Sequence, residues 1–314
     1  MWQKELKKPV IHAKELAKYL HLPVIADPKL KKWGLKAPWS WIRRIKPRDL
    51  HDPLLRQVLP ITDELQRMPG FTYDPLQEKK FTVMPGMLHK YHGRVLLLIA
   101  DNCALNCRFC FRRHYRGEGL NWQQALQYIA SDETIFEVIL SGGDPLLLSD
   151  AALKKYMHKI AAIKHVKYLR IHSRLPIVVP SRITRKLLQV LTSTRLEPII
   201  VVHCNHAQEI NAEVKNKLLQ IKKAGITLLN QTVLLHKIND NAQVLITLSQ
   251  ALFAAGVLPY YLHFLDQVQG AQHFYVNPLK AKNIHAKMMK ELPGYLVPKL
   301  AREIPNAVAK AAIT

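Results

Sequence analysis

Six short apolar runs, each followed by a stretch with helical character, constrain the fold of this 314-residue chain more than any other feature. The runs cover residues 95–100, 137–140, 168–171, 198–202, 227–229 and 259–262. Strands that alternate with helices form parallel sheets joined by right-handed crossovers. The pattern predicts an α/β protein, a partial parallel (β/α)6 barrel preceded by a small helical N-terminal region.

Capping residues predict where the helices between these strands begin and end. Ser149 is suited to cap a helix over residues 151–163, and Ser181 precedes another helical stretch. Gly225 and Gly256 stand where helices commonly end, and Asn277–Pro278 combines an N-cap residue with a proline at the first helical position.

Polar residues follow every predicted strand. In chain order they are Asp101-Asn102-Cys103, Ser141-Gly142-Gly143-Asp144, His172-Ser173-Arg174, His203-Cys204-Asn205-His206, Asn230-Gln231 and His263 with Asp266. In a parallel barrel all these loops lie on the carboxyl-terminal face, where active sites of such folds are built. Six converging polar ends therefore favour an enzyme.

Three of the four cysteines fall within eight residues, in the motif Cys103-Ala-Leu-Asn-Cys107-Arg-Phe-Cys110. Three thiolates at this spacing suit a cubic iron–sulfur cluster whose fourth iron keeps an open coordination position. Structural zinc requires four ligands, and Cys204 lies too far along the chain to be a good fourth. Ordinary ferredoxin clusters also use four cysteines, so the open iron is expected to bind another molecule.

Composition excludes several other classes of protein. Hydrophobic residues make up 48% and charged residues 22% of the chain, so it is not a disordered protein. No apolar run approaches the roughly 18–20 residues that span a bilayer, and the N-terminus has no signal-peptide core. The few cysteines do not suit a secreted disulfide scaffold, so we expect a cytoplasmic protein.

The formal net charge of +23 favours an anionic partner, or is simply a solvated surface. Eight basic residues between Lys29 and Arg48 enclose Trp33, Trp39 and Trp41, an arrangement that can bind nucleic acid. The alternative is an N-terminal region whose tryptophans pack against the main body. The recurring prolines of the first 80 residues suit a wrapping segment, so packing is the favoured interpretation.

The cysteine motif, with Phe109 before its last cysteine, and the sequence SGGDP at 141–145 resemble the radical S-adenosylmethionine (SAM) superfamily. The resemblance implies that Cys103, Cys107 and Cys110 hold a [4Fe–4S] cluster whose open iron binds SAM. It further implies that Gly142, Gly143 and Asp144 form part of the SAM site. One electron from the cluster then cleaves SAM to a 5′-deoxyadenosyl radical.

The sequence from about residue 84 to 310 resembles the lysine 2,3-aminomutase family. The matching stretches are HKYHGRVLLLIADNCALNCRFCFRRH, SGGDPLL, LRIHSRLPIVVPSRIT, HCNH, LLNQTVLL, LHFLDQVQGAQHF and GYLVP. Members are isomerases (intramolecular aminotransferases) that move an amino group between neighbouring carbons, with pyridoxal 5′-phosphate (PLP) carrying the migrating nitrogen. The resemblance implies conversion of L-α-lysine to β-lysine.

The family's PLP lysine follows the GY-x-VP segment by a fixed interval, which points to Lys310, twelve residues after Pro298, as the catalytic lysine. Its segment, PNAVAKAAIT, lacks the glycines of the family's loop, and by position alone Lys310 is a solvated tail lysine. Lys90, Tyr91 and Arg94 match the residues that hold the PLP phosphate.

Further residues are matched to the substrate and to SAM. Arg112 matches the arginine that binds the substrate carboxylate, and its fork suits that group. Asp266 and Glu303 match paired carboxylates that bind the distal ammonium of lysine, although the family commonly has aspartate at the second position. Arg174, His203 and Gln231 lie at strand ends, where they contact SAM or are satisfied polar core residues.

The chain ends just after Lys310, without the zinc-binding extension of the lysine-degrading members. It therefore resembles the shorter branch, which makes (R)-β-lysine for the modification of translation elongation factor P. The expected partners are L-lysine, acidic elongation factor P or its β-lysine ligase in transient contact, and a one-electron donor such as flavodoxin. No membrane is expected, and nucleic acid is not favoured.

We thus predict an N-terminal region (1–83), a radical SAM barrel (84–292) and a C-terminal segment with the PLP lysine (293–314). Two alternatives remain open. One is a radical SAM enzyme that modifies RNA, for which Lys310 is dispensable. The other is a non-catalytic iron–sulfur scaffold.

Overall fold

The computed structural model describes residues 2–23, 33–114, 119–304 and 310–312. The strands are β1 (Thr82–Met84), β2 (Met87–Tyr91), β3 (Arg94–Ala100), β4 (Glu137–Gly142), β5 (Tyr168–Ser173), β6 (Glu197–Val202), β7 (Thr227–Val233), β8 (Leu258–His263), β9 (Lys299–Arg302) and β10 (Ala311–Ala312). The α-helices are α1 (Trp2–Leu6), α2 (Ala13–Leu20), α3 (Trp39–Ile42), α4 (Pro53–Arg56), α5 (Trp122–Ser131), α6 (Asp150–Ala161), α7 (Leu175–Val178), α8 (Arg185–Leu191), α9 (Ala212–Lys223), α10 (Ala242–Ala254) and α11 (Pro278–Glu291). Short 3-10 helices are η2 (Thr62–Leu65), η3 (Glu78–Phe81), η4 (Pro145–Leu147), η5 (Pro180–Arg182), η6 (Ala207–Glu209), η7 (Gln272–Phe274) and η8 (Gly294–Leu296).

All ten strands join one sheet in sequence order, from β1 to β10. The pairs from β3 to β9 are parallel, whereas β1–β2, β2–β3 and β9–β10 are antiparallel. The six predicted strands are confirmed as β3 to β8, and so is an α/β fold with a mostly parallel sheet. The sheet has more strands than the six expected and is not closed, because β1 and β10 form its edges in the described part of the chain.

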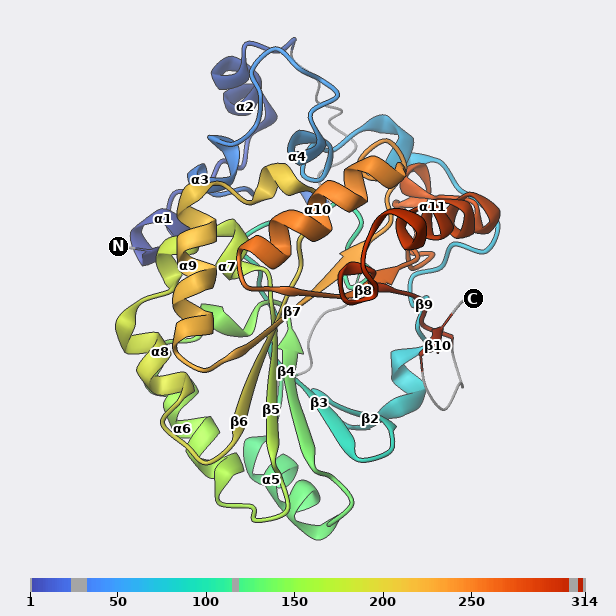
Figure 1. Cartoon of the computed structure of the whole chain (residues 1–314). Coiled ribbons are helices and arrows are strands. Elements are labelled where there is room, and N and C mark those ends of the chain that lie inside the picture. The colour runs from blue at the N-terminus through green and yellow to red at the C-terminus, as the bar shows by residue number, and fades with distance from the viewer. Residues whose placement is uncertain (1, 24–32, 115–118, 305–309, 313–314) are drawn as a thin grey trace.

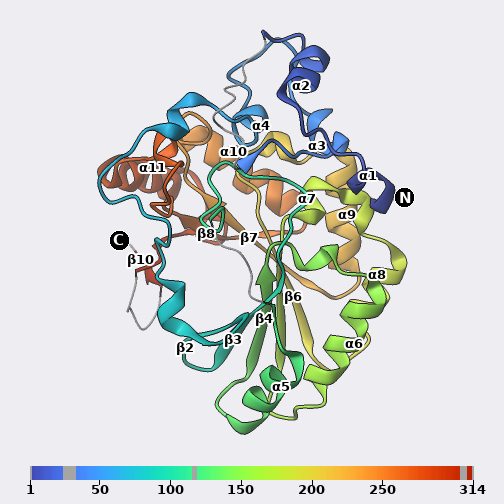
Figure 2. The same cartoon turned by 180° about the vertical axis from the view of Figure 1, so that it is seen from behind.

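Alternation along each parallel strand separates an inner from an outer face. In β5, Leu169 and Ile171 are buried, whereas Arg170 and His172, which alternate with them, line a cavity on the inner face. Side chains alternate because successive Cβ atoms of a strand point to opposite faces. Figures 1 and 2 show the helices α5, α6, α8 and α9 along the outer side of the curved sheet, which leaves the inner side for the cavity.

Most predicted helix boundaries are confirmed. The Ser149 hydroxyl accepts a hydrogen bond from the backbone N–H of Ala152 and caps α6, and Asn277 caps α11, with Pro278 at its first turn. Gly225 and Gly256 adopt positive φ (82° and 80°) just after α9 and α10, as helix-ending glycines do. The residue capping α8 is Thr184, because Ser181 lies within η5.

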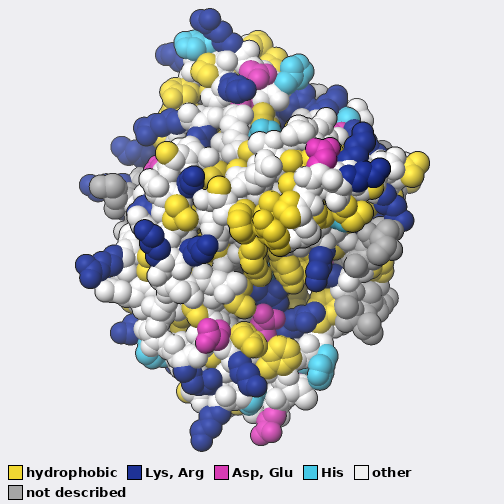
Figure 3. All heavy atoms as spheres, viewed as in Figure 1, with side chains coloured by type: hydrophobic (Ala, Val, Ile, Leu, Met, Phe, Trp, Pro, Cys, Tyr) yellow, Lys and Arg dark blue, Asp and Glu magenta, His cyan; other side chains and the backbone are white. Residues whose placement is uncertain are grey.

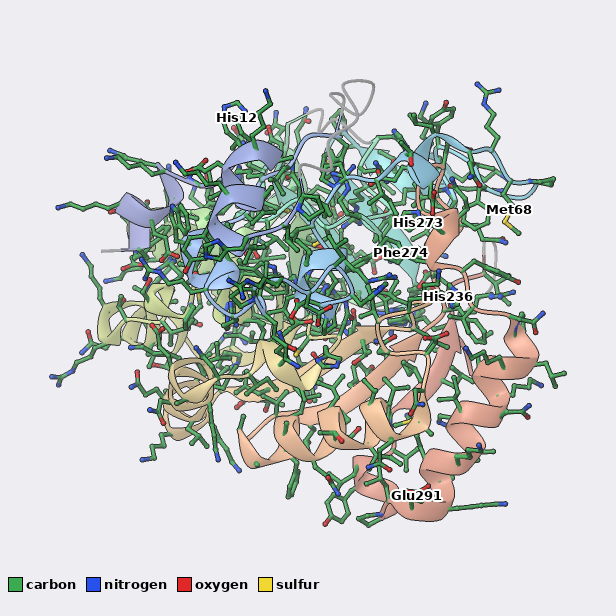
Figure 4. The ribbon with its side chains drawn as sticks, turned by 90° about the horizontal axis from the view of Figure 1, so that it is seen from above. His12, Met68, His236, His273, Phe274 and Glu291 are labelled. Atoms are coloured by element: carbon green, nitrogen blue, oxygen red, sulfur yellow. The ribbon has the colours of Figure 1, made fainter. Side chains whose placement is uncertain are left out.

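The N-terminal helices lie at one end of the molecule and α11 lies on the opposite side, as His12 and Glu291 mark in Figure 4. Trp41 is fully buried in the main core, and the Trp33 indole donates a hydrogen bond to the Cys107 carbonyl. These contacts favour the packing interpretation of the tryptophans; the basic residues Lys29, Lys31 and Lys32 lie outside the described residues. None of the helices in the described ranges is long and apolar enough to cross a membrane.

Candidate functional site

A cavity of about 550 Å³ lies at the carboxyl ends of the parallel strands. All sixteen residues predicted for the site line it: Lys90, Tyr91, Arg94, Cys103, Cys107, Cys110, Arg112, Gly142, Gly143, Asp144, Arg174, His203, Gln231, Asp266, Glu303 and Lys310. Figure 3 shows hydrophobic side chains gathered at the centre of this side of the molecule, with charged side chains directly below them. Residues more than two hundred positions apart in the sequence, such as Lys90 and Lys310, therefore line one cavity.

The three cysteines follow β3 on a loop that lines one wall of the cavity. Burial, with the neighbouring thiols, raises the pKa of Cys103 well above its usual range and that of Cys110 to about 11. Metal binding at these thiols must therefore release protons. In the described part of the chain, no three His, Cys, Asp or Glu side chains are arranged to hold a metal ion.

The N-terminal region forms the support of the cysteine loop. The Arg108 guanidinium donates to both carboxylate oxygens of Glu64, with Nε–Oε1 at 2.8 Å, and Arg113 donates to the same carboxylate. Arg108 also donates to the backbone carbonyl of Trp33. Burial opposes ionisation of Glu64, but the two guanidinium groups outweigh it and lower the pKa of that carboxyl. The loop is thus fixed by a buried ion-pair cluster.

Two glycines let the loop after β4 approach the cysteine loop. A Cβ on Gly143 would overlap the Asn102 carbonyl, and Gly142 has a φ of +108° and lies against the Ala100 carbonyl. Only glycine combines this backbone conformation with such close contact.

Asp144 ties the ends of β4 and β5 together. Its carboxylate accepts hydrogen bonds from the Ser173 hydroxyl at 2.6 Å and from the backbone N–H groups of Arg174 and Leu175 at 2.8 and 3.0 Å. Burial raises the pKa of this carboxyl despite these bonds. In this structure, its contacts organise the two loops around the cavity.

Several polar atoms on the cavity wall have no partner in the described structure. They include Nε2 of His203, Nε2 of His172 and the amide nitrogen of Gln231, all buried. Burial, with the nearby cations, lowers the pKa of His203 to about 3 and that of His172 well below its usual range. Because buried polar groups are nearly always hydrogen-bonded, neutral unpaired groups here fit a polar ligand such as SAM.

Lys310 reaches into the opposite side of the same cavity. Its ammonium nitrogen lies 3.4 Å from His263 Nε2, 3.7 Å from a Glu303 carboxylate oxygen and 4.9 Å from the centre of the Tyr261 ring. Burial lowers the pKa of Lys310 although Glu303 and Asp266 oppose the change. A lysine with a lowered pKa is more often neutral, the form that attacks a carbonyl carbon. The surroundings of Lys310 therefore fit a PLP lysine rather than a solvated tail; its preceding residues 305–309 lie outside the described ranges.

Glu303 contacts two of the three residues predicted to hold phosphate, Lys90 and Tyr91. Its carboxylate accepts hydrogen bonds from the Lys90 ammonium at 2.8 Å and from the Tyr91 hydroxyl, and Arg94 lies over the Tyr91 ring. Burial opposes its ionisation, but Lys310, Lys90 and Tyr91 outweigh it and lower the pKa of Glu303. Because Lys90 and Tyr91 hold this carboxylate, the same two side chains can bind an anion.

Arg112 binds a carboxylate in this structure, that of Glu78 from η3. Its Nε lies 3.1 Å and its Nη2 2.5 Å from the two oxygens of Glu78, and its Nη1 lies 3.3 Å from the Ser141 hydroxyl. Across the cavity, burial and the charge of Glu303 raise the pKa of Asp266 to about 7. The cavity thus contains one guanidinium group, that of Arg112, suited to a carboxylate. It also contains two acids, Asp266 and Glu303, suited to an ammonium group.

Sequence reasoning named His172 and His263 among the polar strand ends but gave them no role at the site. It missed three further cavity residues, Glu78, Arg170 and Tyr261. Nothing in the sequence around Glu78 indicated that it pairs with Arg112, because that contact depends on how η3 folds back over the cavity.

Fold and site together define an α/β enzyme with a cofactor-sized cavity at the carboxyl ends of its parallel strands, where three thiols, a partly buried lysine and anion-binding cations meet. No family model matches the sequence. Curated relatives do: the chain is 46% identical to L-lysine 2,3-aminomutase of Escherichia coli (strain K12), over 98% of this chain and 93% of that protein. The proteins of the same name from Buchnera aphidicola and Haemophilus influenzae are 44% and 43% identical, over 98% and 96% of this chain and 94% and 92% of theirs. The chain belongs to the L-lysine 2,3-aminomutase family, whose members are isomerases.

Among solved structures, TYW1 with a bound lysine-pyruvate adduct superposes with a TM-score of 0.40 at 14% identity, over 68% of this chain and 76% of that chain. A TM-score this low does not establish a common fold.

Proposed function

We propose that this protein is an L-lysine 2,3-aminomutase, which moves the amino group of L-α-lysine to the neighbouring carbon and produces (R)-β-lysine. The observation that carries the proposal is the meeting of Lys310, Arg112, Asp266 and the three cysteines in one cavity. The full-length relatives of 43–46% identity carry the same activity in their names.

Within this proposal, Cys103, Cys107 and Cys110 hold a [4Fe–4S] cluster in a radical SAM (β/α)6 barrel over residues 84–292. Region 1–83 supports the barrel, and segment 293–314 carries the PLP lysine. Gly142 and Gly143 line the same cavity, and they contribute to the SAM site there. The unpaired atoms of His203 and Gln231 face the same space, and Asp144 and Arg174 complete the site. Cluster and SAM, when bound, supply a carbon radical that abstracts hydrogen.

PLP is the second cofactor of the proposal. Lys310 attaches it, and Lys90, Tyr91 and Arg94 bind its phosphate. When bound, PLP carries the migrating nitrogen and stabilises the radical. Because Lys90 and Tyr91 bind Glu303 in this structure, phosphate and Glu303 compete for the same donors, and phosphate binding frees Glu303 to face the substrate.

Substrate recognition follows from charge. Arg112 binds the α-carboxylate through its planar fork, and Asp266 and Glu303 attract the distal ammonium. Two anions facing the side chain favour lysine and repel glutamate. The apolar groups of the cavity, among them Phe109 and Tyr261, exclude water from the reacting carbon.

The product is proposed to serve the modification of elongation factor P. The net charge of +23 is suited to transient contact with that acidic protein or with its β-lysine ligase. A one-electron donor such as flavodoxin is also required. Binding of elongation factor P that is unchanged between low and high salt would rule out the electrostatic contact.

The test is an anaerobic incubation of cluster-reconstituted protein with L-lysine, SAM, PLP and dithionite, analysed by chiral mass spectrometry. We expect (R)-β-lysine from the unmodified protein and from a Lys299→Ala control, whose lysine is exposed. Lys310→Ala should give none, and borohydride should fix PLP to the unmodified protein but not to this variant. Accumulation of 5′-deoxyadenosine without β-lysine would point to another substrate, such as RNA. Protein with a verified cluster that cleaves no SAM would be a scaffold.

A further inference from the structure

We propose that Arg174 is a positioning residue for the iron–sulfur cluster. Its guanidinium hydrogen-bonds the sulfur of Cys107 and thereby raises the reduction potential of the cluster. This inference rests on the proposed function in one respect, the presence of a cluster on the three cysteines. It gives Arg174 a role that is separable from contact with SAM.

The contact itself is direct. Nη1 of Arg174 lies 2.7 Å from the Cys107 sulfur, close enough for a charge-assisted hydrogen bond. Arg174 begins the loop after β5, and Cys107 lies on the loop after β3, so the bond joins two loops of the site. The other two cysteines have no such donor from Arg174.

A buried network fixes the guanidinium in this orientation. Nη2 of Arg174 lies 2.5 Å from Gln57 Oε1 and 3.2 Å from Glu209 Oε2. Gln57 in turn donates to Glu209 at 3.0 Å, and both residues are fully buried. Because Gln57 of the N-terminal region and Glu209 of η6 hold Nη2, Nη1 is directed at the Cys107 sulfur.

Aromatic rings close the remaining sides. The guanidinium carbon lies 4.8 Å from the centre of the Trp41 ring and 5.5 Å from that of Phe109. Trp41 is fully buried, and only about a tenth of the Arg174 side chain is exposed (11%). Charges act strongly on one another in such a low-dielectric setting, because water does not screen them.

The effect on the cluster follows from the charge balance. On reduction the cluster gains one electron from an external one-electron donor, and its negative charge increases by one, while Arg174 stays protonated. A cation that hydrogen-bonds a ligand sulfur stabilises the more negative state. Hydrogen bonds to sulfur are among the factors that set the potentials of such clusters. Glu209, an anion behind the guanidinium, acts in the opposite direction.

The test is a dithionite redox titration of reconstituted protein without SAM, followed by electron paramagnetic resonance. Arg174→Met should lower the equilibrium constant for reduction at least tenfold, which is about 59 mV for a one-electron couple. Arg174→Lys should shift it less and in the same direction, and Glu209→Gln should shift it the opposite way. The matched control is Arg182→Lys: Arg182 is also a buried arginine in an ion pair, with 0% exposure, but its hydrogen-bond partners are Asp150 and the Leu146 and Leu148 carbonyls rather than a thiol.

Opposite shifts in the Arg174 and Glu209 variants, with the control unchanged, support the proposal, since general damage to the fold does not predict opposite signs. Potentials equal to that of the unmodified protein, with weakened SAM affinity, would overturn it and make Arg174 a SAM ligand. If Arg174→Met takes up no cluster, Arg174→Lys and Glu209→Gln decide the question. Iron and sulfide analysis of the unmodified protein distinguishes failure of the Arg174 proposal from failure of the proposed function. If the unmodified protein holds no cluster, the proposed function itself fails.

Discussion

Glu64 and Arg108 form a bidentate ion pair in which neither side chain is exposed to solvent beyond 1%. The pair joins the N-terminal region to the loop that carries the cysteines. Arg113, on the far side of that loop, shares the same carboxylate. One buried acid is therefore shared by the two arginines on either side of Cys110 in the sequence.

Removing the charge of Glu64 should destabilise the protein strongly. Glu64→Gln leaves two buried arginines without a counter-charge, and we expect a loss of about 3–5 kcal/mol in the free energy of unfolding, measured with urea at pH 7. The control is Asp240→Asn, whose partners Lys280 and His236 are 50% and 41% exposed, with an expected change below about 1 kcal/mol. Equal effects in both variants would contradict this role of Glu64.

The same pair makes a prediction about pH. Because the pKa of Glu64 is lowered in the folded state, its stabilisation is fully present above the unfolded value of about 4.3 and is lost as the pH falls through the folded value. The urea midpoint of the unmodified protein should thus fall more steeply on acidification below pH 4 than that of Glu64→Gln.

A methyl group at Gly143 should disturb the contact between the two loops. Gly143→Ala places a Cβ against the Asn102 carbonyl, and such overpacking costs about 1–3 kcal/mol. We expect a lower Tm and weaker SAM binding. Gly294→Ala is the control, because no atom lies within 4 Å of its Cβ and its φ is not positive, so its Tm should be unchanged. A normal Tm with normal SAM binding in Gly143→Ala would show that the loops need no close approach.

Lysine turnover should depend on the ionisation of Asp266. A carboxyl with a pKa of about 7 is protonated below that pH and then no longer attracts the substrate ammonium. We expect kcat/KM for lysine to rise as the pH increases from 6 to 8, and Asp266→Asn to have a lower value without this rise. Glu133→Gln, at an exposed position, should keep the profile of the unmodified protein. A rise that persists in Asp266→Asn would assign the titration to another group.

Glu78 is expected to compete with the substrate for Arg112. In Glu78→Gln the neutral amide is a weaker partner for the guanidinium, so KM for lysine should fall while kcat stays the same, the pattern of altered uniform binding. Steady-state kinetics at pH 8 measure this, with Glu291→Gln as a surface control. An increase in KM would instead mean that Glu78 orients Arg112 for the substrate.

The sequence was informative where structure depends on near neighbours. The strands from β3 to β8 were found because parallel strands buried under helices are continuous apolar runs. The caps of α6 and α11 were found because Ser149 and Asn277 act within three residues of themselves. The cavity followed from topology, since the carboxyl ends of parallel strands meet at one edge.

Contacts between distant residues were not predictable in the same way. Glu64 and Arg108 are 44 positions apart, and Gln57 and Glu209 are 152 apart. The edge strands β1 and β10 and their neighbours β2 and β9 have only two to five residues each, and their pairing depends on the rest of the sheet. The resemblance to a family supplied residues such as Lys310 and Glu303, which periodicity and spacing did not distinguish from surface residues.

The long separation between Gln57 and Glu209 also has a consequence for synthesis of the protein. Ribosomes add about 5–20 residues per second, so roughly 8–30 s pass between the appearance of the two side chains. During that interval the N-terminal region has emerged without the partners that bury its polar groups and Trp41. The N-terminal segment that contacts the cysteine loop therefore completes its packing only after the strands from β1 to β6 have been made.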